Sequence, residues 1–178
     1  MHSFLLAAVI VCGCSASGSQ RGAPSSTPAL ENRAAAAPQP AGGTEEDAIR
    51  LAVYRYLVGH NASAGQTGVP FVCLEINQHD QARDPSPYIM KAMGGSRPRA
   101  VPGSACESSG SGVFLKGDHA KGRGLVLRTE DVKIDGDKAT VTGGYFEAGL
   151  SASGNTYTLE RQRDGSWLVT SDQMQWIS

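Results

Sequence analysis

The chain has 178 residues, 40% of them hydrophobic, and a formal net charge of −1 at pH 7. So balanced a charge predicts no strong electrostatic field, and the sequence has neither a basic stripe nor aromatic residues alternating with Arg or Lys. These properties argue against nucleic-acid binding. The part beyond residue 43 has about 135 residues, an ordinary length for one domain.

The N-terminus has the pattern of an export signal. Phe4 to Val11 is an unbroken apolar run that leads to Cys12-Gly13-Cys14, and it is much shorter than the roughly 20 residues needed to span a bilayer. This pattern resembles a bacterial lipoprotein signal peptide, in which cleavage before a cysteine frees the residue that carries the lipid. The resemblance implies a signal peptide over residues 1–14 and lipidation of Cys14. The alternative is an ordinary secretory signal cleaved within Ser15 to Ser19, which would release a soluble exported protein.

Residues 15–43 have the composition of a flexible linker. The segment consists mainly of Ala, Pro, Ser, Gly and Gln, and Leu30 is its only large aliphatic residue. So little apolar surface cannot offset the entropy lost on ordering the chain. We therefore expect a disordered tether whose ends lie roughly 30 Å apart.

The folded domain, residues 44–178, is expected to begin with an amphipathic helix. Thr44 can cap its first amides, and three carboxylates follow at the positive end of the helix dipole. Gly59 is expected to end the helix. The apolar residues recur at helical spacing and predict one buried stripe: Ala48, Ile49, Ala52, Val53, Tyr56 and Leu57.

A strand and a second, short helix are expected next. Val69 to Ile76 is an apolar run of strand length. Ser86 as N-cap and Pro87 at the first helical position predict a helix that ends at Gly94-Gly95, with Asp84 as the competing cap.

The segment from Ser96 to Ser111 is rich in Pro, Gly and Ser and is expected to be irregular. After it, the apolar runs 113–115 and 125–127 flank a polar loop over residues 117–124. This arrangement predicts a β-hairpin.

The C-terminal third alternates apolar and polar residues, as strands of an antiparallel sheet do. Asp135-Gly136-Asp137 and Arg163-Asp164-Gly165-Ser166 mark two turns. Thr156, Thr158 and Glu160 are expected on the polar face. The apolar face is expected to pack beneath the first helix and consists of Val132, Ile134, Val141, Tyr157, Leu159, Trp167 and Val169.

A helix followed by a long curved antiparallel sheet resembles the cystatin-like and ketosteroid-isomerase-like α+β cones, over about the last 110 residues. The stretch Gly143 to Leu150, the Trp167-Leu168-Val169 segment and the terminal Trp176-Ile177-Ser178 are similar to uncharacterised bacterial exported domains. The fold class expected is therefore α+β, with an N-terminal amphipathic helix on a curved antiparallel sheet, preceded by the tether. Because such cones host enzymes, binding modules and scaffolds alike, the resemblance implies no single function.

Four cysteines are present, and their expected fates differ. If Cys12 leaves with the signal peptide and Cys14 carries lipid, then Cys73 and Cys106 remain as one pair. In an oxidising compartment such a pair forms a disulfide. The alternative, a reactive cysteine beside His79, would need a free thiolate.

No motif assigns a catalytic residue, a cofactor or a metal. His60, His79 and His119 are scattered without ligand spacing. If the sheet encloses a pocket, the acid–base candidates within it are Asp131 and Glu147, with Tyr145 as an oxyanion donor.

The sequence as a whole predicts a lipid-anchored protein of the bacterial cell envelope that acts as a noncatalytic binding or accessory module. Its expected partners are the membrane, through the lipid, and an envelope protein. The alternative is a cone-fold enzyme or small-ligand-binding domain, which a deep apolar pocket holding two polar groups would favour.

Overall fold

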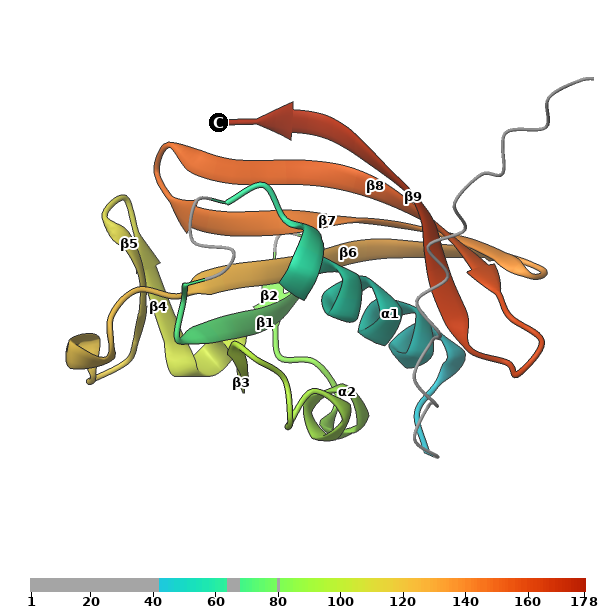
Figure 1. The fold of residues 1–178 in the computed structure, drawn as a ribbon, viewed down its shortest axis with the longest axis horizontal. Coiled ribbons are helices and arrows are strands. Elements are labelled where there is room, and N and C mark those ends of the chain that lie inside the picture. The colour runs from blue at the N-terminus through green and yellow to red at the C-terminus, as the bar shows by residue number, and fades with distance from the viewer. Residues whose placement is uncertain (1–41, 64–67, 80) are drawn as a thin grey trace, which may run out of the picture. The chain divides into compact units, whose positions relative to one another are not determined.

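Two α-helices and nine strands make up the part of the chain that the computed structural model describes, residues 42–63, 68–79 and 81–178 (Figure 1). The helices are α1 Glu45–His60 and α2 Pro87–Ala92, and the short 3-10 turns are η1 Gly103–Ala105 and η2 His119–Lys121. The strands are β1 Phe71–Gln78, β2 Gln81–Arg83, β3 Arg99–Pro102, β4 Cys106–Ser109, β5 Gly112–Leu115, β6 Leu125–Asp135, β7 Lys138–Ala148, β8 Ser151–Arg161 and β9 Trp167–Ile177. The predicted signal peptide and the tether up to residue 41 lie outside the described residues.

The fold class is α+β with a curved, mostly antiparallel sheet, as predicted. The main sheet has the order β2-β1-β6-β7-β8-β9. β3 also belongs to it and pairs with residues 71–74 of β1, whereas β2 pairs with residues 76–78. Its long strands β6 to β9 are antiparallel neighbours. However, β1 runs parallel to both β6 and β3, an arrangement that the sequence did not predict.

Both helices begin where the sequence places them. Thr44 and Asp47 form a reciprocal capping box at the start of α1, with Thr44 Oγ1 accepting from the Asp47 amide at 3.0 Å. Ser86 caps α2 by accepting from the Ile89 amide, and Pro87 occupies its first turn. α1 continues through Gly59 to His60, one residue beyond the predicted end.

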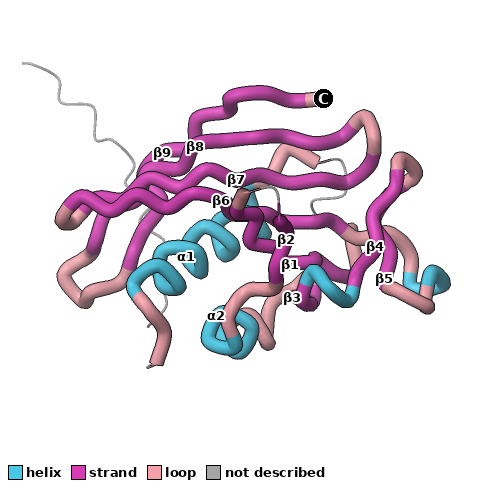
Figure 2. Tube along the Cα trace, turned by 180° about the vertical axis from the view of Figure 1, so that it is seen from behind, coloured by secondary structure: helices cyan, strands magenta, loops and turns pink. Residues whose placement is uncertain are grey.

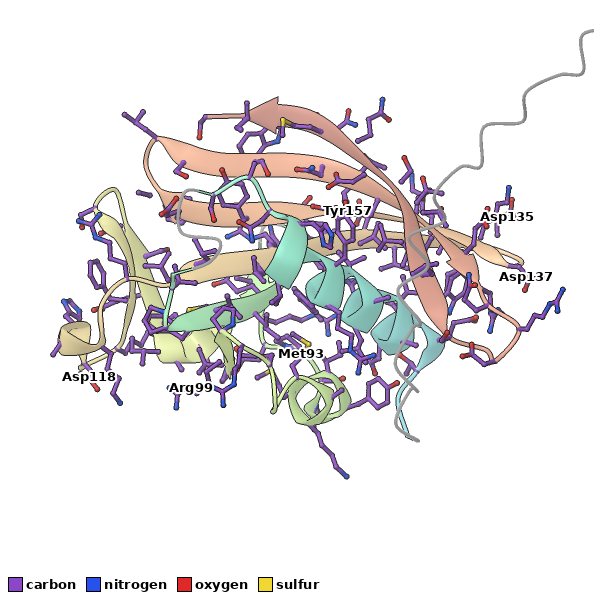
Figure 3. All side chains as sticks on the ribbon, in the orientation of Figure 1. Met93, Arg99, Asp118, Asp135, Asp137 and Tyr157 are labelled. Atoms are coloured by element: carbon purple, nitrogen blue, oxygen red, sulfur yellow. A yellow bond between two sulfur atoms is a disulfide. The ribbon has the colours of Figure 1, made fainter. Side chains whose placement is uncertain are left out.

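We call the sheet face toward α1 the inner face and the opposite face the outer face. One core cluster joins α1 to the inner face, and Figure 3 shows Tyr157 between the sheet and the helix. Its buried members include Ile49, Leu51, Val53, Tyr54, Leu57, Leu74, Leu127, Val141, Tyr157, Leu159 and Trp167. Val132 and Val169 of the predicted apolar face, and Tyr56 of the predicted helix stripe, are only partly buried. The polar face is as predicted on β8, where Thr156 and Thr158 are half-buried and Glu160 is exposed.

The sheet is apolar on both faces at β1 and β6, unlike the C-terminal strands, for which one apolar and one polar face were predicted. A second core cluster lies on the outer face, where Phe71, Cys73 and Val126 pack with side chains of β3, β4 and β5. Figure 2 shows the small β4–β5 sheet at this end of the main sheet, close to β1 and β3. Parallel strands are usually buried on both faces, which explains the unbroken apolar run in β1.

Two further predictions are wrong between residues 96 and 127. The segment expected to be irregular contains β3, η1 and β4. The hairpin expected between residues 113–115 and 125–127 does not form a ladder: β5 pairs with β4, and β6 pairs with β1 and β7. β4 and β5 form a tight hairpin of their own, in which Ser109 pairs with Gly112, whereas β3 pairs with β1, which lies about 28 residues earlier in the sequence. β3 and β4 are short and poor in apolar residues, so their composition alone does not reveal them.

The hairpin at residues 135–137 is confirmed, because Asp135 pairs with Lys138. Ile134, expected in the core, is 44% exposed. β1 pairs with β6 only as far as Thr129, so Ile134 has a neighbouring strand on one side alone. Figure 3 shows Asp135 and Asp137 at this projecting tip.

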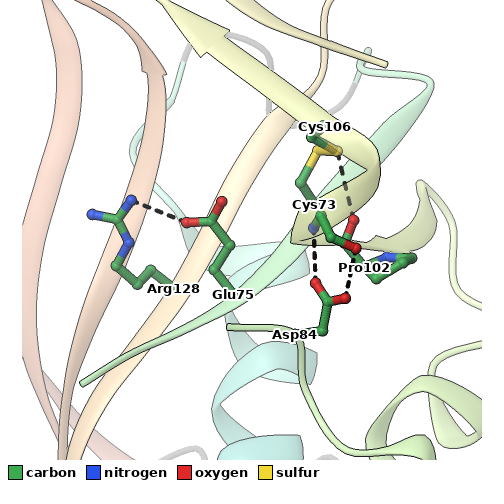
Figure 4. Close-up of a disulfide and its surroundings, with 7 residues drawn as sticks. Cys73, Glu75, Asp84, Pro102, Cys106 and Arg128 are labelled. Carbon is green, nitrogen blue, oxygen red and sulfur yellow. Dashed lines mark hydrogen bonds and ion pairs between the residues drawn. A yellow bond between two sulfur atoms is a disulfide. The ribbon is translucent and has the colours of Figure 1, made fainter. Parts of the chain in front are cut away.

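The predicted disulfide is confirmed. Cys73 on β1 and Cys106 at the start of β4 are bonded, with their Cα atoms 6.4 Å apart (Figure 4). This distance lies within the range of about 4.4–6.8 Å that disulfides require. The bond fastens the small β4–β5 sheet to the outer face of β1.

Candidate functional site

Polar side chains of α1 form hydrogen bonds to residues of the sheet beneath it. Arg50, which is 1% exposed, donates to Thr129 Oγ1 at 2.9 Å and to the Glu130 carbonyl at 2.6 Å, and it pairs with Glu46. The Tyr54 hydroxyl donates to the Glu75 carbonyl and lies 3.0 Å from Thr129 Oγ1. Burial of an arginine in a helix that also carries an apolar stripe has no separate signal in the sequence.

A second polar group lies nearer the edge of the inner face. Asn155 Nδ2 donates to Asp172 at 2.6 Å, and Ser153 donates to the Asn155 side-chain oxygen at 2.8 Å. Desolvation, reinforced by the Asp172 charge, raises the pKa of both Tyr56 and Tyr157. The polar groups are thus used in internal hydrogen bonds, and the space between helix and sheet is occupied by large side chains.

These buried tyrosines predict a loss of stability in alkali. Burial raises the pKa of Tyr54 and of Tyr157 above the ordinary 10.0. A folded-state pKa above the unfolded value favours the folded state fully below about pH 10 and progressively less as the pH rises toward the folded-state pKa. We expect the free energy of unfolding, measured by urea titration, to fall above about pH 10, and Tyr54→Phe with Tyr157→Phe to flatten that fall. Titration of all tyrosines at their ordinary pKa in the folded protein would contradict this expectation.

The structure does not join the acid–base candidates into one site. The Tyr145 side chain is 4% exposed and belongs to the inner core. Glu147 accepts a hydrogen bond from Ser151 near the β7–β8 turn. Asp131 is exposed beside a bulge in β6, where its amide donates to Thr142 Oγ1.

The histidines are similarly separate. The His60 ring stacks on Tyr56 with centroids 4.4 Å apart, and the His119 ring stacks on Phe114 and contacts Glu107. His79 is exposed with a positive φ of 50°, and its neighbour at position 80 lies outside the described residues. Within the described ranges, no group of three or more His, Cys, Asp or Glu side chains is placed to hold a metal ion.

A small hollow lies on the outer face of the sheet, beyond the part that β4 and β5 cover. Five residues pair across five strands in one lateral row, in the order Glu75, Arg128, Gly144, Gly154 and Trp176. The two glycines lack side chains, so the row is open between the arginine and the tryptophan. The outer-face hollow has a volume of about 210 Å³.

The tryptophan at one end of the hollow lies over the sheet. A Cβ atom on Gly154 would be 2.1 Å from Trp176 Nε1, so the indole occupies the space above this glycine. Trp176 is nevertheless 55% exposed. The indole therefore rests against the backbone while much of its surface faces solvent.

The arginine at the other end is held by one ion pair. Arg128 Nη2 lies 3.1 Å from Glu75 Oε2 (Figure 4), and the two side chains are 39% and 16% exposed. Arg128 Nε is buried and has no hydrogen-bond partner among the residues described. An unpaired buried donor is costly unless something supplies an acceptor.

Between its two ends, the hollow combines apolar and polar walls. Val126 and Phe146 border it toward the second core cluster, while Glu130, Thr142 and Gln175 add polar groups. One cation, one anion, an amide and a hydroxyl converge beside an exposed indole, which suits a small, uncharged, polar ligand. The only sequence signals for this site were the Gly143-Gly144 pair and the terminal tryptophan, because the cross-strand register that unites them is tertiary.

A larger depression borders Gly59, Val69, Arg97 and Arg99. We assign it no function.

Comparisons of the chain with protein-family models, curated proteins and solved structures found no match. In the described part of the chain, no helix is both long enough and apolar enough to cross a bilayer.

Proposed function

We propose that this protein is a lipid-anchored, noncatalytic module of the bacterial cell envelope that binds an envelope component through the outer-face hollow. Cys14 would carry the lipid, and residues 15–43 would act as a disordered tether between membrane and domain. The amphipathic helix α1 would serve as the fixed cover of the inner face, leaving the outer face to bind.

The outer-face hollow is the observation that carries this proposal. A tryptophan that is 55% exposed on a folded domain is a typical binding residue, since its indole offers a large, rigid, amphipathic surface. The inner face supports a structural role better than a catalytic one, because Arg50, Tyr54 and Asn155 donate to protein partners there.

The alternative is a cone-fold enzyme or a domain that binds its ligand on the inner face. The buried Tyr145 is the residue that favours it. The separate positions of Asp131 and Glu147 argue against an enzyme, because acid–base catalysis needs its groups within hydrogen-bond reach of one reacting atom.

The lipid anchor is tested by expressing the protein in a bacterium that processes lipoproteins and by measuring how much of it is in the membrane fraction and how much in the soluble fraction. We expect the wild-type chain to partition with membranes and Cys14→Ser to appear in the soluble fraction or to be misprocessed. The lipid is what binds the membrane, so Cys73→Ala with Cys106→Ala should not release the protein. A soluble wild-type protein whose mature N-terminus lies beyond Cys14 would overturn the lipid anchor.

Binding is tested separately with the purified Cys14→Ser chain, which has no lipid to retain it. We expect it to sediment with washed envelope fragments and Trp176→Ala to lower the sedimented fraction several-fold. Met174→Ala is the matched control, because Met174 is also an exposed apolar residue of β9, 47% exposed, but does not line the hollow. Equal retention of both variants would rule out the hollow as the binding surface.

A further inference from the structure

We infer that the ligand of the outer-face hollow is a single neutral sugar ring, a pyranose unit stacked beside Trp176 and hydrogen-bonded to Arg128. This inference rests on the proposed binding function and names the class of ligand. The hollow is small, has bare backbone in its floor, and carries both charged and neutral polar groups in its walls.

Size limits the ligand to about one ring. Pockets that enclose drug-sized molecules have volumes of roughly 300–1,000 Å³, and the hollow has about 210 Å³. Because the indole of Trp176 covers Gly154, the open part of the row lies over Gly144, between Arg128 and the indole. Arg128 and Trp176 bound that space on opposite sides.

The floor favours a flat ligand. Gly144 and Gly154 leave bare backbone at the centre of the row, and the indole of Trp176 covers the second glycine. A pyranose ring has C–H groups on its flat faces and hydroxyl groups around its rim. Such a ring can pack its C–H face on the indole while its rim contacts the walls.

The walls favour a neutral, polyhydroxylated rim. Arg128 and Glu130 contribute opposite charges, and Thr142 and Gln175 add a hydroxyl and an amide. Glu75 already neutralises part of the Arg128 charge at 3.1 Å, so a free anion gains little there. The Arg128 side chain lines the hollow and is 39% exposed, so a sugar oxygen or an acetamido carbonyl can accept a hydrogen bond from its guanidinium group.

The experiment is a titration of the Cys14→Ser chain with N-acetylglucosamine, followed by Trp fluorescence and by equilibrium dialysis of the labelled sugar. Glucosamine and glucuronate serve as cationic and anionic probes of similar size. We expect the neutral sugar to bind at least about tenfold more tightly than either charged one, a difference of about 1.4 kcal/mol. A β-1,4-linked trimer of the same sugar should bind with similar affinity if a single ring fills the site.

Two variants test the roles of the residues at the ends of the row. Gly154→Ala forces the indole of Trp176 away from the sheet without removing a functional group, and the contact it creates is with a side chain that can rotate. Arg128→Lys keeps the positive charge beside Glu75 but loses the planar guanidinium with its several donors. Each should weaken sugar binding roughly tenfold or more, whereas Arg163→Lys, an exposed arginine outside the hollow, should not.

The outcomes separate this inference from the proposed function. Absence of sugar binding together with Trp176-dependent retention on envelope fragments would overturn the sugar and leave the binding module. Equal binding of neutral and charged sugars would overturn the role given to charge balance, and so this inference. Sugar binding that Gly154→Ala and Arg128→Lys leave unchanged would place the sugar elsewhere and would also overturn it.

Discussion

Replacing Trp167 with alanine is expected to lower the free energy of unfolding by roughly 3–5 kcal/mol, as truncation of a buried aromatic residue generally does. Trp167 is 3% exposed at the start of β9 and belongs to the core cluster between α1 and the inner face. The Arg161 guanidinium also lies over its ring, 4.7 Å from the centroid, and this cation–π contact would be lost as well. Total stabilities of about 5–15 kcal/mol are usual for a domain, so the substitution should remove a large share of the total.

The matched control is Thr158→Ala on the neighbouring strand β8. Thr158 is half-buried on the outer face, and its backbone carbonyl, which the substitution retains, accepts from Thr170. Thr158→Ala should lower the free energy of unfolding by no more than about 1 kcal/mol. Urea unfolding followed by circular dichroism measures both variants. Equal losses for the two would mean that Trp167 does not pack as described.

Loss of the disulfide is the second large effect expected. The bond between Cys73 and Cys106 spans 33 residues of sequence. A closed loop of that length restricts the unfolded chain by roughly 3.5–4 kcal/mol in the chain-entropy treatment. The free energy of unfolding of the double variant Cys73→Ala with Cys106→Ala should therefore fall by about this amount. No further penalty is expected, because alanine leaves no buried polar atom in place of the sulfur.

The same variant should show where the disulfide acts. Cys106 begins β4, and the β4–β5 sheet shares the second core cluster with β1. We expect amide exchange at Val113 and Leu115 on β5 to quicken more than exchange at Leu159 in the inner core. If the free energy of unfolding fell by less than about 1 kcal/mol, or if amide exchange changed equally at all these residues, hydrophobic contacts alone would hold the small sheet in place.

Local chemistry was sufficient to predict the features that depend on neighbouring residues. The Thr44 capping box, the Ser86 cap and the hairpin at residues 135–137 each involve contacts within a few positions of the chain. The pairing of Cys73 with Cys106 followed from an export signal and from counting thiols, and the bond is present in the structure. The inner positions of Tyr157 and Leu159 followed from strand alternation, because successive side chains on a strand point to opposite faces.

The tertiary structure decided everything that required two distant segments to meet. β1 finds parallel partners in β3 and β6, which lie about 30 and about 50 residues later in sequence, and this pairing makes Cys73 face a second core. Arg50 is buried only because Thr129 and Glu130 of β6 accept its hydrogen bonds. The outer-face hollow likewise exists only because the sheet register aligns Arg128, Gly144, Gly154 and Trp176. The sequence by itself determined the caps, the local turns and the pair of cysteines, since these are set over short distances. The candidate site depends on strand register, which is set by the packing of the whole sheet.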